Sequence, residues 1–64
     1  MSESQRVGPW IVSLSKQSDG FHIDAFYNNK LDEDLSDIFQ DEYIARVYYN
    51  NVIQRANLEA VLKG

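Results

Sequence analysis

The stretch WIVSLSKQSDGFHIDAFY, residues 10–27, has the clearest structural pattern in this chain. Apolar and polar side chains alternate in two runs that are rich in β-branched and aromatic residues, and Asp19-Gly20 separates the runs. Such alternation is typical of a strand with one buried face, and Asp-Gly between two such runs is a strong hairpin signal. The stretch therefore predicts an antiparallel β-hairpin from Trp10 to Tyr27.

The predicted hairpin has the same two faces in either of its two possible registers. A two-residue turn sets Leu14 opposite Ala25, whereas a four-residue loop sets Leu14 opposite Ile23, and neither choice moves a side chain to the other face. The face expected to be buried carries Trp10, Val12, Leu14, Phe21, Ile23, Ala25 and Tyr27. The outward face carries Ile11, Ser13, Ser15, His22, Asp24 and Phe26.

Ile11 and Phe26 are apolar residues on this otherwise polar outward face. Either a second subunit or a helix from Leu31 to Gln40 could cover them. The free edges of a two-stranded sheet also favour pairing with another chain. We therefore predict a homodimer that extends or stacks the hairpin.

Upstream of the hairpin, residues 1–8 are mainly polar and lead into a Gly-Pro pair, which interrupts regular structure. We predict a flexible tail over residues 1–8 and one small domain over residues 9–64. No run reaches the ~18 apolar residues of a membrane span, and the N-terminus lacks the basic-then-apolar order of a signal peptide. These features predict a cytoplasmic chain that does not contact a membrane.

Downstream of the hairpin, the stretch LDEDLSDIFQDEY, residues 31–43, is strongly acidic. Its apolar residues recur with the spacing of one helix stripe, which predicts a short helix near Leu31–Phe39. Acidic residues in the first turn of such a helix interact favourably with the helix dipole. The six carboxylates of this stretch belong to Asp32, Glu33, Asp34, Asp37, Asp41 and Glu42.

The last third of the chain permits two interpretations. A helix from Asp41 to Lys63 is preferred, because its apolar stripe continues through Asn50 and Asn51 without a change of phase. In the alternative, Tyr43 to Tyr49 is a third strand followed by a shorter helix. The stripe expected to be buried consists of Ala45, Tyr49, Val52, Ile53, Ala56 and Ala60. A second apolar strip, which indicates a second packing partner, consists of Ile44, Val47, Leu58 and Leu62.

These elements predict an α+β fold of the order hairpin, short acidic helix and C-terminal helix (ββαα), with ββαβ as the alternative. The predicted core consists of Trp10, Val12, Leu14, Ile23, Tyr49, Val52, Ile53 and Ala56. A chain of 64 residues has a thin core, and without Cys and with a single His it has neither disulfides nor a Cys/His zinc site to reinforce that core. Good packing or a partner must therefore stabilise it.

The sequence predicts neither catalysis nor a bound metal or cofactor. Its three glycines stand apart, so they form no phosphate-binding loop. His22 and Asp24, with Ser13 and Ser15 across the hairpin, have the composition of a catalytic triad, but an open two-stranded face offers neither a concave site nor oxyanion donors. His22, Asp24 and Asp19 also lack a metal-binding loop pattern. We therefore expect a non-enzymatic protein without a small-molecule substrate.

The charge of the chain argues against direct binding to nucleic acid. The net charge is −4 and the six Lys and Arg residues are scattered, whereas contact with a phosphate backbone requires clustered cations. The acidic face instead suits a basic partner surface, because Asp34, Asp37 and Asp41 would form one helical stripe with a spacing like that of phosphates. Phe39 or Tyr43 would then act as an apolar anchor beside it.

Two resemblances follow from these motifs. The SDG turn, LSDIF and DEYI, in the order of hairpin, acidic helix and Tyr-rich segment, resemble small phage-encoded inhibitors of host DNA enzymes, of the dimeric uracil-DNA glycosylase inhibitor type. WIVSLSKQSDGFHIDAF followed by EYIARVYYNNVIQR is also similar to small bacterial proteins built from a hairpin and one long helix, which implies a dimer. The two resemblances imply different structures for the last third, and neither carries a functional residue to this chain.

The leading hypothesis for function is a small, acidic, non-enzymatic protein–protein interaction module. It would form a homodimer and would regulate or inhibit another, unidentified protein by occupying its surface. The alternative hypothesis is an acidic mimic of nucleic acid, as the phage-inhibitor resemblance implies, that inhibits a host DNA-binding enzyme such as uracil-DNA glycosylase.

Overall fold

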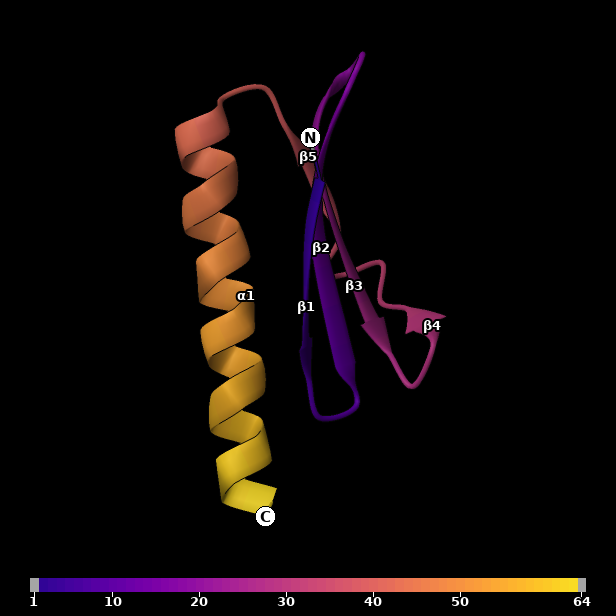
Figure 1. Cartoon of the computed structure of the whole chain (residues 1–64), viewed down its shortest axis with the longest axis vertical. Coiled ribbons are helices and arrows are strands. Elements are labelled where there is room, and N and C mark those ends of the chain that lie inside the picture. Colours follow the sequence, from indigo (N-terminus) through magenta and orange to yellow (C-terminus); the bar gives the residue numbers. More distant parts are fainter. Residues whose placement is uncertain (1, 64) are drawn as a thin grey trace.

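A computed structural model of the chain describes residues 2–63 and has the predicted α+β architecture, an antiparallel sheet packed against one C-terminal helix (Figure 1). The elements are β1 (Ser2–Val7), β2 (Trp10–Gln17), β3 (Gly20–Tyr27), β4 (Lys30–Leu31), β5 (Asp37–Phe39) and α1 (Glu42–Lys63). Strands β1 to β4 lie side by side in chain order, and β5 also pairs with β3. The molecule measures 38 × 21 × 20 Å, with α1 along the longest axis.

The predicted hairpin is confirmed as strands β2 and β3. Leu14 pairs with Ile23, the register expected for the four-residue loop. The pairing continues to Gln17 and Gly20, however, so the turn itself consists of two residues, Ser18 and Asp19. Gly20, at the start of β3, has a φ of 135°, and a Cβ there would lie 2.7 Å from the carbonyl oxygen of Phe39. Only glycine suits this position, because the backbone of β5 passes directly beside it.

The prediction of a flexible tail over residues 1–8 is wrong for residues 2–7, which form β1. This strand pairs antiparallel with β2 along its whole length. Gly8 has a positive φ of 58°, the conformation that glycine supplies in a tight hairpin turn. The Gly-Pro pair therefore connects two strands instead of ending regular structure, and burial of Val7 in the core fixes the new strand.

The predicted acidic helix near Leu31–Phe39 does not form. Strands β4 and β5 instead pair with opposite ends of β3, and the backbone N–H of Asp32 donates to the Ala25 carbonyl at 2.8 Å between them. The segment makes only one helix-like hydrogen bond, from the Ser36 N–H to the Asp32 carbonyl at 3.1 Å. The segment forms strands and not a helix because the edge of β3 presents backbone donors and acceptors, which a separate helix could not satisfy.

The preferred C-terminal helix is confirmed as α1, and the alternative of a third strand at Tyr43 to Tyr49 is wrong. Asp41 caps the helix, since one carboxylate oxygen accepts hydrogen bonds from the N–H groups of Tyr43 at 2.8 Å and Ile44 at 3.3 Å. The cap satisfies amides that the first turn would otherwise leave unpaired. It therefore marks the point at which the chain leaves the sheet and becomes helical.

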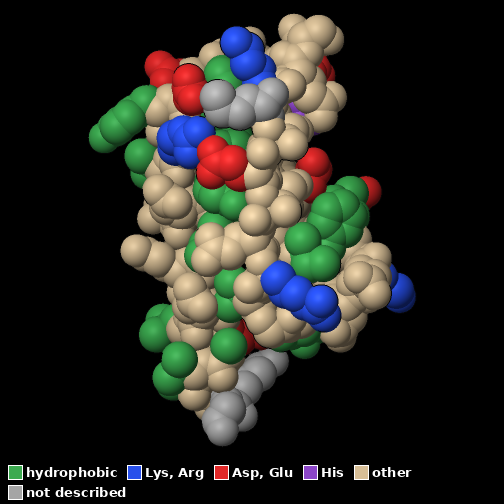
Figure 2. Space-filling model, viewed as in Figure 1, with side chains coloured by type: hydrophobic (Ala, Val, Ile, Leu, Met, Phe, Trp, Pro, Cys, Tyr) green, Lys and Arg blue, Asp and Glu red, His purple; other side chains and the backbone are tan. Residues whose placement is uncertain are grey.

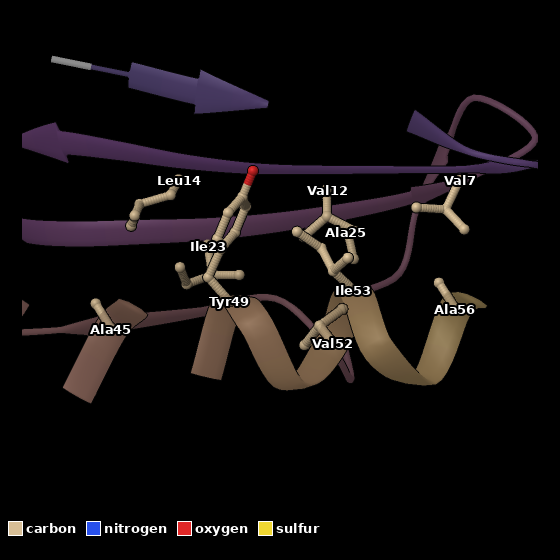
Figure 3. Close-up of a cluster of buried hydrophobic side chains, with 10 residues drawn as sticks. All are labelled: Val7, Val12, Leu14, Ile23, Ala25, Ala45, Tyr49, Val52, Ile53 and Ala56. Atoms are coloured by element: carbon tan, nitrogen blue, oxygen red, sulfur yellow. The ribbon is translucent and has the colours of Figure 1, made fainter. Parts of the chain in front are cut away.

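The core lies between one face of the sheet and one side of α1, as Figure 3 shows. Val12 and Ile23 are completely buried at its centre, and burial of each contributes about 1.5–3 kcal/mol to stability. The buried apolar residues are Val7, Val12, Leu14, Ile23, Ala25, Ala45, Tyr49, Val52, Ile53 and Ala56. All predicted core residues belong to this set except Trp10, which is half-buried and meets Tyr27 edge to face with ring centroids 4.9 Å apart.

Candidate interaction surfaces

The carboxylates expected to form an acidic partner surface do not lie on one helix. Glu33 and Asp34 are exposed in the turn between β4 and β5, and residues 2–63 provide no hydrogen-bond donor to either carboxylate. The predicted stripe through Asp34, Asp37 and Asp41 is wrong, because these residues belong to a turn, a strand and a helix cap. The acidic stretch is therefore not arranged as a regular row of charges.

Asp32 and Asp37 stabilise the backbone of this same segment. A carboxylate oxygen of Asp32 accepts hydrogen bonds from the N–H groups of Asp34 at 3.0 Å and Leu35 at 3.2 Å. The Asp37 carboxylate accepts one from the N–H of Ile38 at 2.8 Å. Acidic side chains commonly stabilise turns in this way, so both carboxylates already have a role in the fold.

The two carboxylates at the start of α1 are engaged as well. Asp41 caps the helix, and Glu42 lies 3.6 Å from Arg46 one turn along. Arg46 also donates to Glu3 of β1 at 2.6 Å, and this hydrogen bond lowers the pKa of the Glu3 carboxyl. The charges near the start of α1 thus connect the helix to β1.

Ile11 and Phe26 lie next to each other on the face of the sheet that points away from α1. They are cross-strand partners in β2 and β3, and the register extends the row to Arg6 on β1 and Leu31 on β4. Ile11 and Phe26 are half-buried by their neighbours, and Leu31 is 48% exposed. No element within residues 2–63 covers this face, which we call the open sheet face and define by the row Arg6, Ile11, Phe26 and Leu31.

The two other predicted anchors have different surroundings. Phe39 is half-buried and packs against Tyr48, with ring centroids 5.0 Å apart, so its ring already has a partner inside the fold. The Tyr48 hydroxyl donates to the Leu35 carbonyl at 2.6 Å, which connects α1 to the acidic turn. Tyr43 is 76% exposed at the start of α1. Of these two anchors, only Tyr43 is therefore accessible to a partner.

The side of α1 opposite the core is also apolar. Its exposed large apolar side chains are Tyr43, Ile44, Val47, Leu58, Val61 and Leu62. The second strip predicted from the sequence lies on this side, but that prediction missed Val61, which is 75% exposed. The signal was available, because Val61 is three residues beyond Leu58 just as Val47 is three residues beyond Ile44.

His22 is held by the turn of its own hairpin. Ser15 lies opposite His22 and Ser13 opposite Asp24 in the register, but His22 Nε2 is hydrogen-bonded to the Asp19 carboxylate at 2.6 Å. This hydrogen bond lowers the pKa of Asp19. The group stands on an exposed sheet face and not in a concave site, so its geometry gives no sign of a catalytic arrangement.

A hollow of about 350 Å³ lies between α1, the start of β2 and the acidic turn. It is lined by Trp10, Asp32, Asp34, Leu35, Val52, Arg55, Ala56 and Glu59. The indole N–H of Trp10, one of these lining residues, is buried without an acceptor among residues 2–63. The lining combines four apolar residues with three carboxylates and one arginine, and this mixture identifies no class of ligand, so we assign none to the hollow.

Comparisons with known proteins identify no relative. No protein-family model, no curated protein and no solved structure matches the chain. Within residues 2–63, no cluster of three or more His, Asp or Glu side chains is placed to hold a metal ion. The same residues contain no helix with both the length and the apolar character needed to cross a membrane.

Proposed function

We propose that this chain is a small, acidic, non-enzymatic protein–protein interaction module of the cytoplasm. It forms a homodimer and regulates or inhibits another protein by occupying a surface on that protein. The observation that carries the proposal is that α1 has apolar side chains on both sides: one side packs on the sheet, and the other exposes apolar residues near both ends, over residues 43–47 and 58–62. An extended exposed apolar surface is a typical mark of an association site.

The molecule has two uncovered faces, which suit two different partners. The outer side of α1 and the open sheet face lie on opposite sides of the two-layer fold. A homodimer that uses one of them leaves the other accessible. This arrangement supports a dimer that presents two identical surfaces to a partner protein.

Sedimentation equilibrium at low and high salt, with far-ultraviolet circular dichroism on the same samples, tests the homodimer. We expect a folded dimer whose dissociation constant changes little with salt, because burial of apolar surface is not screened by ions. A folded monomer at every accessible concentration would overturn the homodimer proposal.

The surface offered to another protein is tested by using the dimer as bait in a cell extract. A Phe26→Glu bait, altered on the open sheet face, is expected to lose the captured protein. A Gln5→Glu bait is the matched control, because Gln5 is exposed on the edge strand β1 and pairs with the core residue Val12, which places it on the opposite face of the sheet. Equal capture by both baits would show that the open sheet face is not the partner surface.

A second proposal, an acidic mimic of nucleic acid, has support from two exposed carboxylates, Glu33 and Asp34. Its test is the double variant Glu33→Gln with Asp34→Asn, which removes charge without touching the caps and turns that Asp32 and Asp41 stabilise. Loss of a salt-sensitive complex with a DNA-binding enzyme such as uracil-DNA glycosylase would favour the mimic. Unchanged binding of an apolar partner would favour the interaction module.

A further inference from the structure

The exposed side of α1 has the regular spacing of a coiled-coil seam. Counted from Ile44, its positions continue in alternating steps of three and four residues. This heptad pattern keeps a narrow strip of one helix turned toward a second helix. We call this strip the outer seam, and it consists of Ile44, Val47, Asn51, Gln54, Leu58 and Val61.

Every residue of the outer seam is exposed in the single chain. The apolar members range from 43% exposed at Val47 to 75% at Val61, and both amide residues are exposed as well. Figure 2 shows the left margin of the molecule, formed by α1, with green side chains near both ends and tan ones between them. The seam is therefore fully available to another molecule.

The outer seam contains no charged residue, although the exposed side of a helix normally carries charges. Among the charged side chains of α1, Arg46 lies beside Glu3 and Glu42 next to β1. Arg55 and Glu59 border the hollow between the helix and the sheet. These charged side chains of α1 thus lie to either side of the outer seam and not on it. An uncharged strip of this kind suits contact with another uncharged surface.

Along the helix, the outer seam consists of an apolar pair, an amide pair and a second apolar pair. The order of residue types is therefore the same from either end. An antiparallel second copy would set Ile44 against the partner's Val61, Val47 against the partner's Leu58, and Asn51 against the partner's Gln54. Amide side chains both donate and accept hydrogen bonds, so the central pair satisfies itself. A shift in register would place an amide against an aliphatic side chain and leave it unpaired.

Charge at the start of the helix favours the antiparallel over the parallel orientation. Asp41 caps this end of α1, and Glu42 is the first residue of the helix. A parallel pair would bring two such groups together, whereas an antiparallel pair separates them by about 33 Å, the length of the 22-residue helix. The antiparallel pair also sets the start of each helix dipole beside the end of the other.

From these observations we infer that the second copy in the homodimer binds through the outer seam, with the two α1 helices antiparallel. The inference rests on the proposed homodimer and names its surface and orientation. The resulting dimer has four layers, in the order sheet, helix, helix, sheet. Both open sheet faces lie outermost, where each is accessible to a partner protein.

The first test replaces apolar seam residues with charges. The double variant Val47→Glu with Leu58→Glu is expected to weaken dimerisation at least about tenfold in sedimentation equilibrium, because it places uncompensated charges in the buried seam. Phe26→Glu, on the open sheet face, is the matched control and is expected to remain dimeric. The reverse pattern, a dimer in the seam variant and a monomer in the control, would overturn the inference.

The second test determines orientation with single cysteines, which are unique because the chain has none. Val47→Cys and Leu58→Cys chains are mixed under reducing conditions and then oxidised, and mass spectrometry identifies the disulfides. An antiparallel pair is expected to give the mixed disulfide between positions 47 and 58. A parallel pair would give like-with-like disulfides instead, since the two positions are about 16 Å apart along a helix and a disulfide spans less than about 7 Å.

The outcomes separate failure of this inference from failure of the proposed function. A wild-type monomer would remove the homodimer itself. A wild-type dimer that persists in the double glutamate variant would retain the homodimer and reject the outer seam. Like-with-like disulfides would retain the seam and reject the antiparallel orientation. Circular dichroism of each variant confirms that the fold is intact, and the cysteine variants give an answer even if the glutamates perturb it.

Discussion

The inner side of α1 packs on the sheet with Ala45 completely buried and Ala56 nearly so, whereas the outer seam of the same helix stays exposed along its whole length. Both sides are rich in aliphatic residues and neither carries a charge at its centre. The inner side, however, has small residues that let the helix approach the sheet closely. The outer seam instead has branched side chains around a central amide pair, a pattern that suits another helix better than a flat sheet.

This difference shows that apolar character alone does not decide which side of a helix a fold buries. A helix lying on a sheet needs a broad, shallow strip, and the inner side supplies it with alanines between Tyr49, Val52 and Ile53. A helix paired with a helix needs a narrow seam of protruding side chains. Substitutions of the same kind on the inner side and on the outer seam therefore test whether the two sides differ in this way.

The largest effect is expected from placing the same charge on each side. Ile53→Glu places a carboxylate in the core between α1 and the sheet, so we expect a loss of more than about 3 kcal/mol in the free energy of unfolding, enough to unfold most of so small a chain. Val47→Glu, on the exposed side, is expected to leave the stability of the folded monomer almost unchanged. Urea denaturation followed by circular dichroism measures both, and equal losses would contradict the distinction between the two sides.

A smaller loss of stability is expected from removing the Asp41 cap, which stabilises the first turn of α1 and therefore acts on the inner and outer sides alike. Asp41→Ala leaves the amides of Tyr43 and Ile44 without their acceptor, which should cost about 0.5–2 kcal/mol. Asp34→Ala is the matched control, and we expect a change within about 0.5 kcal/mol because Asp34 is exposed and accepts no hydrogen bond from residues 2–63. Comparable losses in the two variants would mean that the cap does not stabilise α1.

The outer seam alone is addressed by Asn51→Leu. In the proposed antiparallel dimer this change sets a leucine against the partner's Gln54, whose amide then loses its hydrogen-bond partner, so self-association is expected to weaken by about tenfold. The stability of the isolated monomer should not change, because Asn51 is exposed in it. Light scattering coupled to size-exclusion chromatography measures the effect, and an unaltered dimer population would place Asn51 outside the interface.

The smallest effect is expected from alkaline pH, which acts near the inner side. Burial raises the pKa of Tyr48 and of Tyr49, and the charges of Asp37 and Asp32 add to the effect at Tyr48. A tyrosine whose folded pKa lies above its unfolded value of about 10 keeps its full stabilising contribution below pH ~10 and loses it as the pH rises through the folded pKa. Stability should therefore decline above pH ~10.

The control for this prediction is Tyr49→Phe, which removes one of the two ionisable hydroxyls while keeping the ring. Urea midpoints measured at about pH 8 and about pH 11 should differ less in Tyr49→Phe than in the wild type. An identical pH dependence in both proteins would show that ionisation of Tyr49 is not coupled to unfolding.

The strands formed by the acidic segment and by the N-terminal residues could not be predicted from sequence patterns. The spacing of Leu31, Leu35 and Ile38 fits one side of a helix, yet this segment forms strands because β3 has an unpaired edge that only backbone groups can complete. The N-terminal residues have no alternation, since only Val7 is buried, and their strand depends on pairing with β2. For the candidate surfaces, too, only the features that depend on local patterns were predicted. Residues of the hairpin and of the C-terminal helix were assigned to the correct faces, whereas the predicted acidic face required a helix that does not form.

The β2–β3 hairpin, the position of α1 and the two apolar sides of that helix could be predicted from the sequence alone. These features depend on periodicity and on turn residues that act over a few positions along the chain, so they can be read locally. In contrast, the strand over residues 2–7 and the pairing of the acidic segment with the opposite edge of the sheet become apparent only in the folded molecule. Each of these depends on hydrogen-bonding groups or packing surfaces that are distant in sequence and become neighbours only in the folded chain.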